Sequence, residues 1–213
     1  MKKRILCFGD SNTYGYDPNG GRYDESIRWP MAMQSRLGGG YTVIEEGLNG
    51  RTAVYDDPVE GGYKSGLAYL PPCIMTHNPL DLIIIMLGTN DLKSRFGLNA
   101  YTIAQCQERL IEACRAYGET ENGGDPEILL VSPAHVGDWI ADTWLGPIFG
   151  TASIETSRHL GKEYARVAKI HGCHFFDAAP VVELAREDAL HFTVRGQIAL
   201  AEAMTQKVFE IFR

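Results

Sequence analysis

The sequence contains no cluster of basic residues. Its 20 Lys and Arg are outnumbered by 27 Asp and Glu, for a formal net charge of −7, and no run of like charges occurs. Proteins that bind nucleic acid or anionic membranes usually gather Lys and Arg on one surface. We therefore expect neither of these partners, and a small-molecule substrate that is neutral or weakly charged.

Long hydrophobic runs are also missing. No apolar stretch approaches the roughly 18 residues of a membrane span. The apolar part of the N-terminal MKKRILCFGD is too short for the core of a signal peptide. We expect a cytoplasmic protein.

Paired cysteines are absent as well. The five cysteines form no CxxC pair, and their number is odd. Cys7 lies in an apolar stretch, and Cys106 and Cys114 lie on the apolar stripe of an expected helix. We expect small buried side chains in a reducing compartment rather than disulfides or a zinc site.

Short apolar runs are what the sequence does contain. Five of them, near-continuous and without alternation, are typical of parallel strands covered by helices on both faces: residues 4–8, 41–45, 82–87, 128–131 and, more weakly, 174–176. Helical periodicity lies between and after them, at residues 26–37, 101–118, 160–171 and 198–211. Strand and helix alternate throughout, so the sequence predicts one α/β domain over residues 1–213, a doubly wound three-layer sandwich.

Two connections are longer than such a fold requires. Residues 46–66 are rich in Gly and Asp, and residues 133–153 carry Trp139, Trp144 and Phe149. Long loops in a compact domain are more often functional than idle.

Polar residues follow the expected strands, where a parallel sheet places its ligand crevice. The first strand ends in Gly9-Asp10-Ser11, the second runs on to Gly50, and the third ends in Gly88-Thr89-Asn90-Asp91. Asp188-Ala189-Leu190-His191 precedes the last helix. A hydroxyl, a glycine amide, a carboxamide and a carboxylate–imidazole pair at one edge are the groups that acyl transfer needs.

Ser11 is the candidate nucleophile, His191 its base and Asp188 the partner that orients the imidazole. A serine hydroxyl needs a base near neutral pH, and a carboxylate on Nδ1 leaves Nε2 free to accept the serine proton. Each residue also has a structural alternative. Ser11 could cap a helix, and the Asp188–His191 segment could start one.

Ser11 N–H, Gly50 N–H and the Asn90 carboxamide are the candidate oxyanion hole. Taken singly, Gly50 could serve a turn and Asn90 a helix cap. We expect structural roles for Asp10 and Asp91. A metal held by Asp10, Asn90, Asp91 and His191 is the less favoured alternative, because no HExxH or dense carboxylate cluster occurs.

These four segments, GDSNTYG, Gly50, GTND and DALH, resemble in order and spacing the sequence blocks of the SGNH (GDSL) hydrolases, over nearly the whole chain. Within that family, KRILCFGDS, VIEEGLNGRT and PLDLIIIMLGTND resemble bacterial arylesterases and acyltransferases of the Mycobacterium smegmatis type. The resemblance implies a flavodoxin-like fold with five parallel strands. It also implies Ser11, His191 and Asp188 as the triad, an oxyanion hole of Ser11, Gly50 and Asn90, and no metal or organic cofactor.

The resemblance further implies a homo-oligomer, an octamer as in relatives of this subgroup, with Asn12, Tyr16 and Trp144 near the substrate. We expect a serine esterase of short-chain, acetyl-type esters of small, aryl or sugar alcohols, with possible acyl transfer to alcohols. A carbohydrate deacetylase that uses the same chemistry is the first alternative. The alternative of another class is a small-molecule binding module in which residues 9–15 hold a phosphate, although these residues lack the GK[ST] of a phosphate-binding loop.

Overall fold

The structure is a computed structural model that describes residues 2–213. Five parallel strands form the centre of the molecule. The strands are β1 (Lys3–Gly9), β2 (Tyr41–Gly47), β3 (Leu82–Met86), β4 (Glu127–Ser132) and β5 (His174–Asp177), in the order β2-β1-β3-β4-β5. The predicted three-layer fold with a five-stranded parallel sheet is confirmed.

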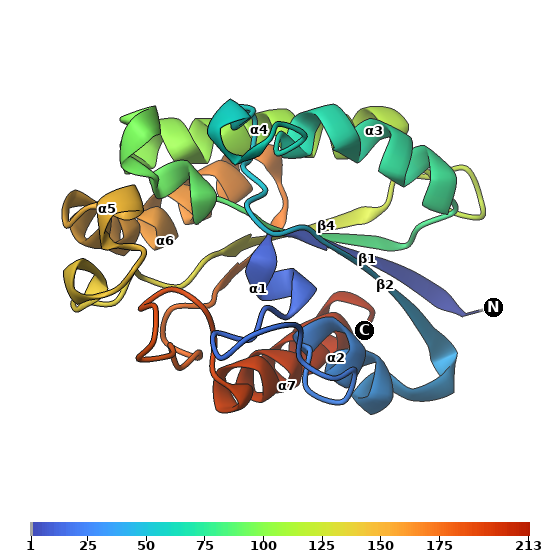
Figure 1. The fold of residues 1–213 in the computed structure, drawn as a ribbon. Helices are drawn as coiled ribbons and strands as arrows, with labels where there is room; N and C mark the ends of the chain where they lie inside the picture. The colour runs from blue at the N-terminus through green and yellow to red at the C-terminus, as the bar shows by residue number, and fades with distance from the viewer. Residues whose placement is uncertain (1) are drawn as a thin grey trace.

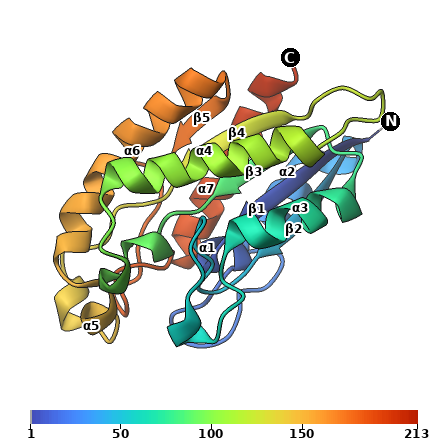
Figure 2. The ribbon, with the colours of Figure 1, turned by 90° about the horizontal axis from the view of Figure 1, so that it is seen from above.

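Helices cover both faces of this sheet (Figure 1). On one face lie α3 (Gly66–His77), α4 (Ala100–Tyr117) and α6 (Ala152–His171), as Figure 2 shows from above. On the other face lie α2 (Trp29–Leu37) and α7 (Val194–Ile211). The remaining helices are short: α1 (Ser11–Tyr14), α5 (Gly146–Phe149) and 3₁₀ turns at Gly38–Gly40, Pro58–Glu60, Asn90–Leu92, Ser94–Phe96 and Ile140–Asp142.

The double cover explains why the strands read as continuous apolar runs. Successive side chains of a strand point to opposite faces. In β1, Leu6 and Phe8 pack under α3 and α4, while Ile5 and Cys7 pack against α2 and α7. All four side chains are fully buried, so successive positions of the strand are apolar and no alternation with polar residues occurs.

Helix α6 begins at Ala152 rather than at residue 160, and α7 begins at Val194 rather than at 198. Two further helices also differ from the expectation. The helix expected over residues 26–37 begins only at Trp29, because Asp24 accepts a hydrogen bond from the backbone N–H of Ser26 (2.9 Å) and holds residues 24–28 in a turn. Helix α3 was not predicted, because Pro71 and Pro72 in its interior read as a helix break. Ser65 caps this helix by accepting from the Ala68 amide at 3.2 Å.

The structure bears on two further expectations, those for the cysteines and for membrane spans. All five cysteines are free; four are buried and Cys173 is half-buried. Within residues 2–213, no helix combines the length and the apolar character needed to cross a bilayer.

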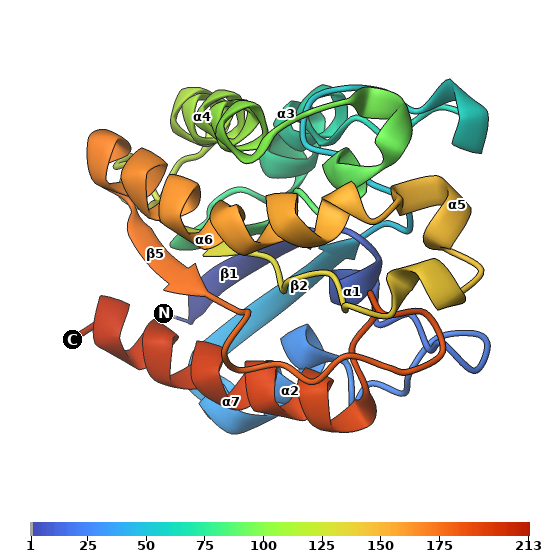
Figure 3. The ribbon, with the colours of Figure 1, turned by 90° about the vertical axis from the view of Figure 1, so that its left-hand side faces the viewer.

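The carboxyl ends of the strands meet at one edge of the sheet. Helices α1 and α5 lie at this end of the molecule, and both chain termini lie at the other (Figure 3). This edge holds the candidate site.

Candidate active site

Ser11 lies on a sharp turn at the carboxyl end of β1. Asp10 caps α1, because its Oδ1 accepts from the Asn12 amide at 3.0 Å, and Ser11 is the first residue of the helix. Gly15, in the left-handed conformation, ends the helix after one turn. The capping role considered for Ser11 thus belongs to Asp10, and the hydroxyl of Ser11 is free to face the crevice.

Two glycines let this turn pack directly on the sheet. A Cβ added at Gly9 would collide with the Thr13 side chain, and one added at Gly47 would collide with the backbone of Tyr14. The backbone of α1 therefore rests on the end of β2 with no side chain between them.

His191 and Asp188 complete a chain of hydrogen bonds to Ser11. The Nε2 atom of His191 lies 2.8 Å from Ser11 Oγ, and its Nδ1 lies 2.6 Å from Asp188 Oδ2. Asp188 Oδ1 accepts from the backbone amides of Leu190 and His191 at 3.0 and 2.9 Å. The structure thus brings together the three residues that the sequence assigned to a triad, although Ser11 and His191 are 180 positions apart.

The local environment keeps Asp188 ionised. Burial disfavours the carboxylate, but the hydrogen bonds from the His191 ring and the two amides outweigh it and hold the pKa of Asp188 below its ordinary value. An ionised Asp188 requires a proton on Nδ1 and so leaves Nε2 as the acceptor for the serine proton.

Asn12 does not contact the substrate space, contrary to the expectation. It is 3% exposed; its Nδ2 donates to the Leu190 carbonyl at 3.4 Å and its Oδ1 accepts from the Phe192 amide at 3.2 Å. Both ends of the amide are therefore used to fasten α1 to the loop that carries His191. Tyr16 does reach the site, with its ring centroid 4.4 Å from that of His191.

Gly50 and Asn90 lie in the same cavity as Ser11 and His191. Gly50 has a φ of +79°, which favours glycine, and a Cβ there would approach Glu60 Oε2 to 2.5 Å. Asn90 Nδ2 donates to the Arg51 carbonyl at 3.1 Å. That bond fixes the carboxamide and leaves its second N–H to serve as a donor.

Asp10 and Asp91 are buried beneath the site and bind backbone amides. Asp91 accepts from the Ala53 amide at 3.0 and 3.1 Å. Burial raises the pKa of Asp10 to about 6 and that of Asp91 to about 7. The structural roles expected for both are confirmed. Among residues 2–213, Asp10, Asp91 and His191, three members of the metal set considered above, do not form a group with converging ligand atoms.

The cavity above Ser11 has a volume of about 250 Å³ and two unlike walls. One wall is apolar and comes from the α5 region: Trp144, Leu145, Ile148 and Phe149. The opposite rim is polar and comes from residues 49–64 and 93: Asn49, Glu60, Lys64 and Lys93. Both loops that were expected to be functional for their length therefore border the site. Trp144 is 61% exposed at its mouth, whereas Trp139 lines a different part of the surface and donates to the Arg186 carbonyl.

The ion pairs behind the polar rim were not predicted from the sequence. Lys93 is 2% exposed, and its Nζ lies 3.0 Å from Asp57 Oδ2 and 2.6 Å from Glu60 Oε1. The partners are more than 30 positions apart, so no local pattern reports them. The charge of Lys93 holds Glu60 at the edge of the cavity.

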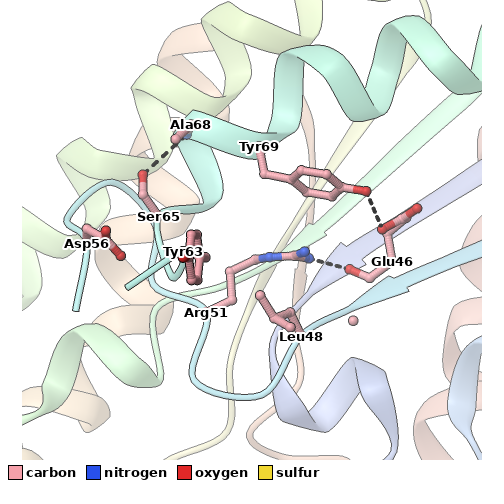
Figure 4. A pocket seen from close by; sticks show the side chains of 9 residues that line it. Glu46, Leu48, Arg51, Asp56, Tyr63, Ser65, Ala68 and Tyr69 are labelled. Carbon is pink, nitrogen blue, oxygen red and sulfur yellow. Dashed lines mark hydrogen bonds between the residues drawn. The ribbon is translucent and has the colours of Figure 1, made fainter. Parts of the chain in front are cut away.

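A second cavity, of about 580 Å³, is lined by residues of the 46–66 segment and by Ala68 and Tyr69 of α3 (Figure 4). Arg51, Tyr63 and Tyr69 are among its lining residues, and Ser11, Asp188 and His191 are not. The candidate site is therefore the smaller of the two.

Comparisons with known proteins agree with this geometry. The model of the GDSL-like Lipase/Acylhydrolase family matches residues 7–198. An acetylxylan esterase of Xylanibacter ruminicola is 26% identical over 96% of this chain, which spans 43% of that enzyme's length. Among solved structures, Est24, a carbohydrate acetylesterase from Sinorhizobium meliloti, is 36% identical with a TM-score of 0.92, covering 99% of this chain and 100% of the other. The aryl esterase of M. smegmatis is 35% identical with a TM-score of 0.90, covering 98% and 99%.

Proposed function

The chain belongs to the GDSL-like lipase/acylhydrolase family, and we propose that it is a metal-independent serine esterase of short-chain esters, with Ser11 as nucleophile. The observation that carries this proposal is the unbroken hydrogen-bond chain from Ser11 Oγ through His191 to Asp188, at 2.8 and 2.6 Å. A binding module has no need for an activated hydroxyl in this arrangement.

In the proposed reaction, Ser11 Oγ attacks the ester carbonyl while His191 Nε2 accepts its proton. The oxyanion that develops on the carbonyl oxygen receives hydrogen bonds from Ser11 N–H, Gly50 N–H and the Asn90 amide. When the tetrahedral intermediate collapses, His191 gives the proton to the leaving alcohol. Water, or a second alcohol, then attacks the acyl-enzyme with His191 again acting as base.

The cavity favours a small acyl group. Its volume of about 250 Å³ lies below the range of roughly 300–1,000 Å³ typical of drug-sized ligand sites. Ile148 and Phe149 are part of its apolar lining. We propose that the acetyl methyl packs against this wall, and that turnover falls as the acyl chain lengthens.

The polar rim favours an alcohol that carries further hydroxyls. Glu60 is paired with Lys93, but its carboxylate and the Lys64 ammonium still offer acceptor and donor positions at the mouth. Sugar hydroxyls can use these positions and a plain aryl ring cannot. We therefore propose acetylated carbohydrates as the preferred substrates. The names of two relatives, an acetylxylan esterase and a carbohydrate acetylesterase, agree with this choice. Aryl acetates are the second class of substrate. The exposed ring of Trp144 can stack on an aryl leaving group as well as on a sugar.

Self-association is part of the proposal. Trp144 and Tyr63, 61% and 88% exposed, flank the two cavities and would gain burial against a second copy. Light scattering on the purified chain tests this, and a monomer at working concentration would contradict it.

The nucleophile is tested by Ser11→Ala. We expect it to abolish turnover of p-nitrophenyl acetate and stoichiometric labelling by a fluorophosphonate, with an unchanged far-UV spectrum. Ser132→Ala is the matched control. Ser132 is also a buried serine at a strand's carboxyl end, and its hydroxyl has no hydrogen-bond partner among residues 2–213. Activity retained by Ser11→Ala would refute the mechanism.

The substrate class is tested by kcat/KM across acyl chains from acetate to octanoate, on aryl and on acetylated xylo-oligosaccharide leaving groups. We expect the sharpest fall between acetate and butyrate, and a preference for the carbohydrate. A Glu60→Gln variant should reduce carbohydrate turnover more than aryl turnover. Equal losses on both would contradict a sugar contact at the polar rim.

A further inference from the structure

Outside the candidate active site, three side chains with metal-binding atoms converge between strand β2 and helix α3. They are Glu46 near the end of β2 and Cys73 and His77 on α3, and their ligand atoms all lie within 4.8 Å of one another. His77 Nε2 is 2.9 Å from a carboxylate oxygen of Glu46. Within residues 2–213, no other three His, Cys, Asp or Glu side chains converge in this way.

The fold itself brings these groups together. Cys73 and His77 are four positions apart on a helix, so they lie on the same face, one turn from each other. That face packs on the sheet beside β2, which supplies Glu46 from the opposite side. An ion bound by this set would add metal–ligand bonds to the hydrogen bonds that already join β2 and α3 through Glu46.

The cluster is open to solvent on one side. Cys73 is only 2% exposed, but the side chains of Glu46 and His77 are 21% and 26% exposed. The cavity of about 580 Å³ reaches Glu46 and Tyr69, and Figure 4 shows the Tyr69 hydroxyl directed at the Glu46 carboxylate. An ion can therefore enter from the cavity and meet the carboxylate first.

The donor atoms select one class of cation. A thiolate, an imidazole and a carboxylate suit Zn²⁺ and chemically similar divalent ions, whereas Mg²⁺ and Ca²⁺ require oxygen ligands. One carboxylate and one thiolate also balance a charge of +2.

We propose that Glu46, Cys73 and His77 bind one divalent cation of the Zn²⁺ class, with water in the fourth position. On binding, the Cys73 thiol releases its proton to solvent, and the His77 ring keeps its single proton on Nδ1 so that Nε2 coordinates the ion. This site is separate from the triad, and the proposal holds whether or not Ser11 is the nucleophile.

Binding at this place stabilises the segment that leads to the oxyanion hole. The backbone carbonyl of Glu46 accepts a hydrogen bond from the Arg51 guanidinium, and the carbonyl of Arg51 accepts from Asn90. An ion that fixes Glu46 against α3 should raise the melting temperature of the protein, since the three ligands converge only in the folded state.

The test is titration of the untagged, EDTA-treated protein with Co²⁺ and Zn²⁺. We expect a 1:1 Co²⁺ complex with the d–d bands of a tetrahedral ion and a sulfur-to-metal charge-transfer band in the near ultraviolet. Cys73→Ser should remove the charge-transfer band. His77→Gln should weaken Zn²⁺ binding in calorimetry at least about 10-fold, since loss of an outer partner alone costs 10–100-fold.

Two variants serve as controls. Cys173→Ser removes the half-buried cysteine, and His159→Gln removes a histidine paired with Glu155 at 3.0 Å, much as His77 is paired with Glu46. Both should bind as the wild type does. If Cys73→Ser fails to fold, His77→Gln and Glu46→Gln decide the matter, because both residues are partly exposed. Absence of 1:1 binding, or binding that survives loss of either Cys73 or His77, would overturn the proposal.

Discussion

Asp188→Asn tests the central role proposed for the carboxylate that touches His191. Asp188 Oδ1 accepts from the amides of Leu190 and His191, and Oδ2 accepts from His191 Nδ1. Asparagine has one oxygen in place of two. Its oxygen must take the position of Oδ1, because two backbone donors would otherwise be left buried and unpaired. Its NH₂ then faces Nδ1.

This orientation reverses the hydrogen bonding of the imidazole. An NH₂ group cannot accept, so Nδ1 becomes the acceptor and the ring proton moves to Nε2. Nε2 then donates toward Ser11 and cannot take its proton. The corresponding substitution in a serine protease lowers kcat by about 10⁴, which corresponds to about 5.4 kcal/mol of transition-state stabilisation.

Turnover of p-nitrophenyl acetate and the rate of fluorophosphonate labelling measure the effect, and both should fall together. Asp177→Asn is the matched control. Asp177 also accepts from a backbone amide two residues on, that of Ala179 at 3.1 Å, at the end of β5. A decrease below about 10-fold in a folded Asp188→Asn protein would refute the tautomer argument, because the loss expected from it is ~10⁴.

Two further predictions concern the floor of the site. Asn90→Ala should lower kcat by about 10²–10³ with little change in KM, because the amide binds the oxyanion and not the ground state; a change confined to KM would contradict this role. Asp10→Asn should flatten the dependence of stability on pH. The pKa of Asp10 is raised to about 6 by burial, so the folded protein retains a proton that the unfolded chain loses near pH 4. The contribution of Asp10 to the free energy of unfolding should therefore fall by up to about 3 kcal/mol as the pH rises from about 4 to about 6, and the variant lacks this part of the wild-type slope. Urea unfolding across this range measures the slope, and equal slopes in variant and wild type would contradict the reasoning.

The sheet was predictable because burial on both faces leaves a simple pattern. Ile5 to Phe8 are all apolar since two helical layers cover them. The edge strand β5 is only half-buried, so its pattern is weaker. Helix α3 escaped prediction because Pro71 and Pro72 carry a strong local signal, and packing of Leu70, Cys73 and Ile74 overrides it.

The site was predictable where its parts are close in sequence or lie at strand ends. Asp188 and His191 form their pair within one turn, and the topology of a parallel sheet brings Ser11 to them. Asn12 was misassigned because a polar residue beside a nucleophile is typical of a substrate contact. Its real partners, Leu190 and Phe192, lie about 180 positions away, and contacts of that length leave no local trace.

The close packing of α1 on β2 bears on how the proposed esterase would acquire new substrates. Gly9 and Gly47 let α1 pack directly on the sheet, and the Asn12 amide ties α1 to the loop that carries His191, so the position of Ser11 does not depend on the side chains at the mouth of the cavity. Trp144 and Lys64 can therefore vary at the mouth without displacing the reacting oxygen. Variation that creates new specificities should collect at the rim, while the two glycines admit no replacement.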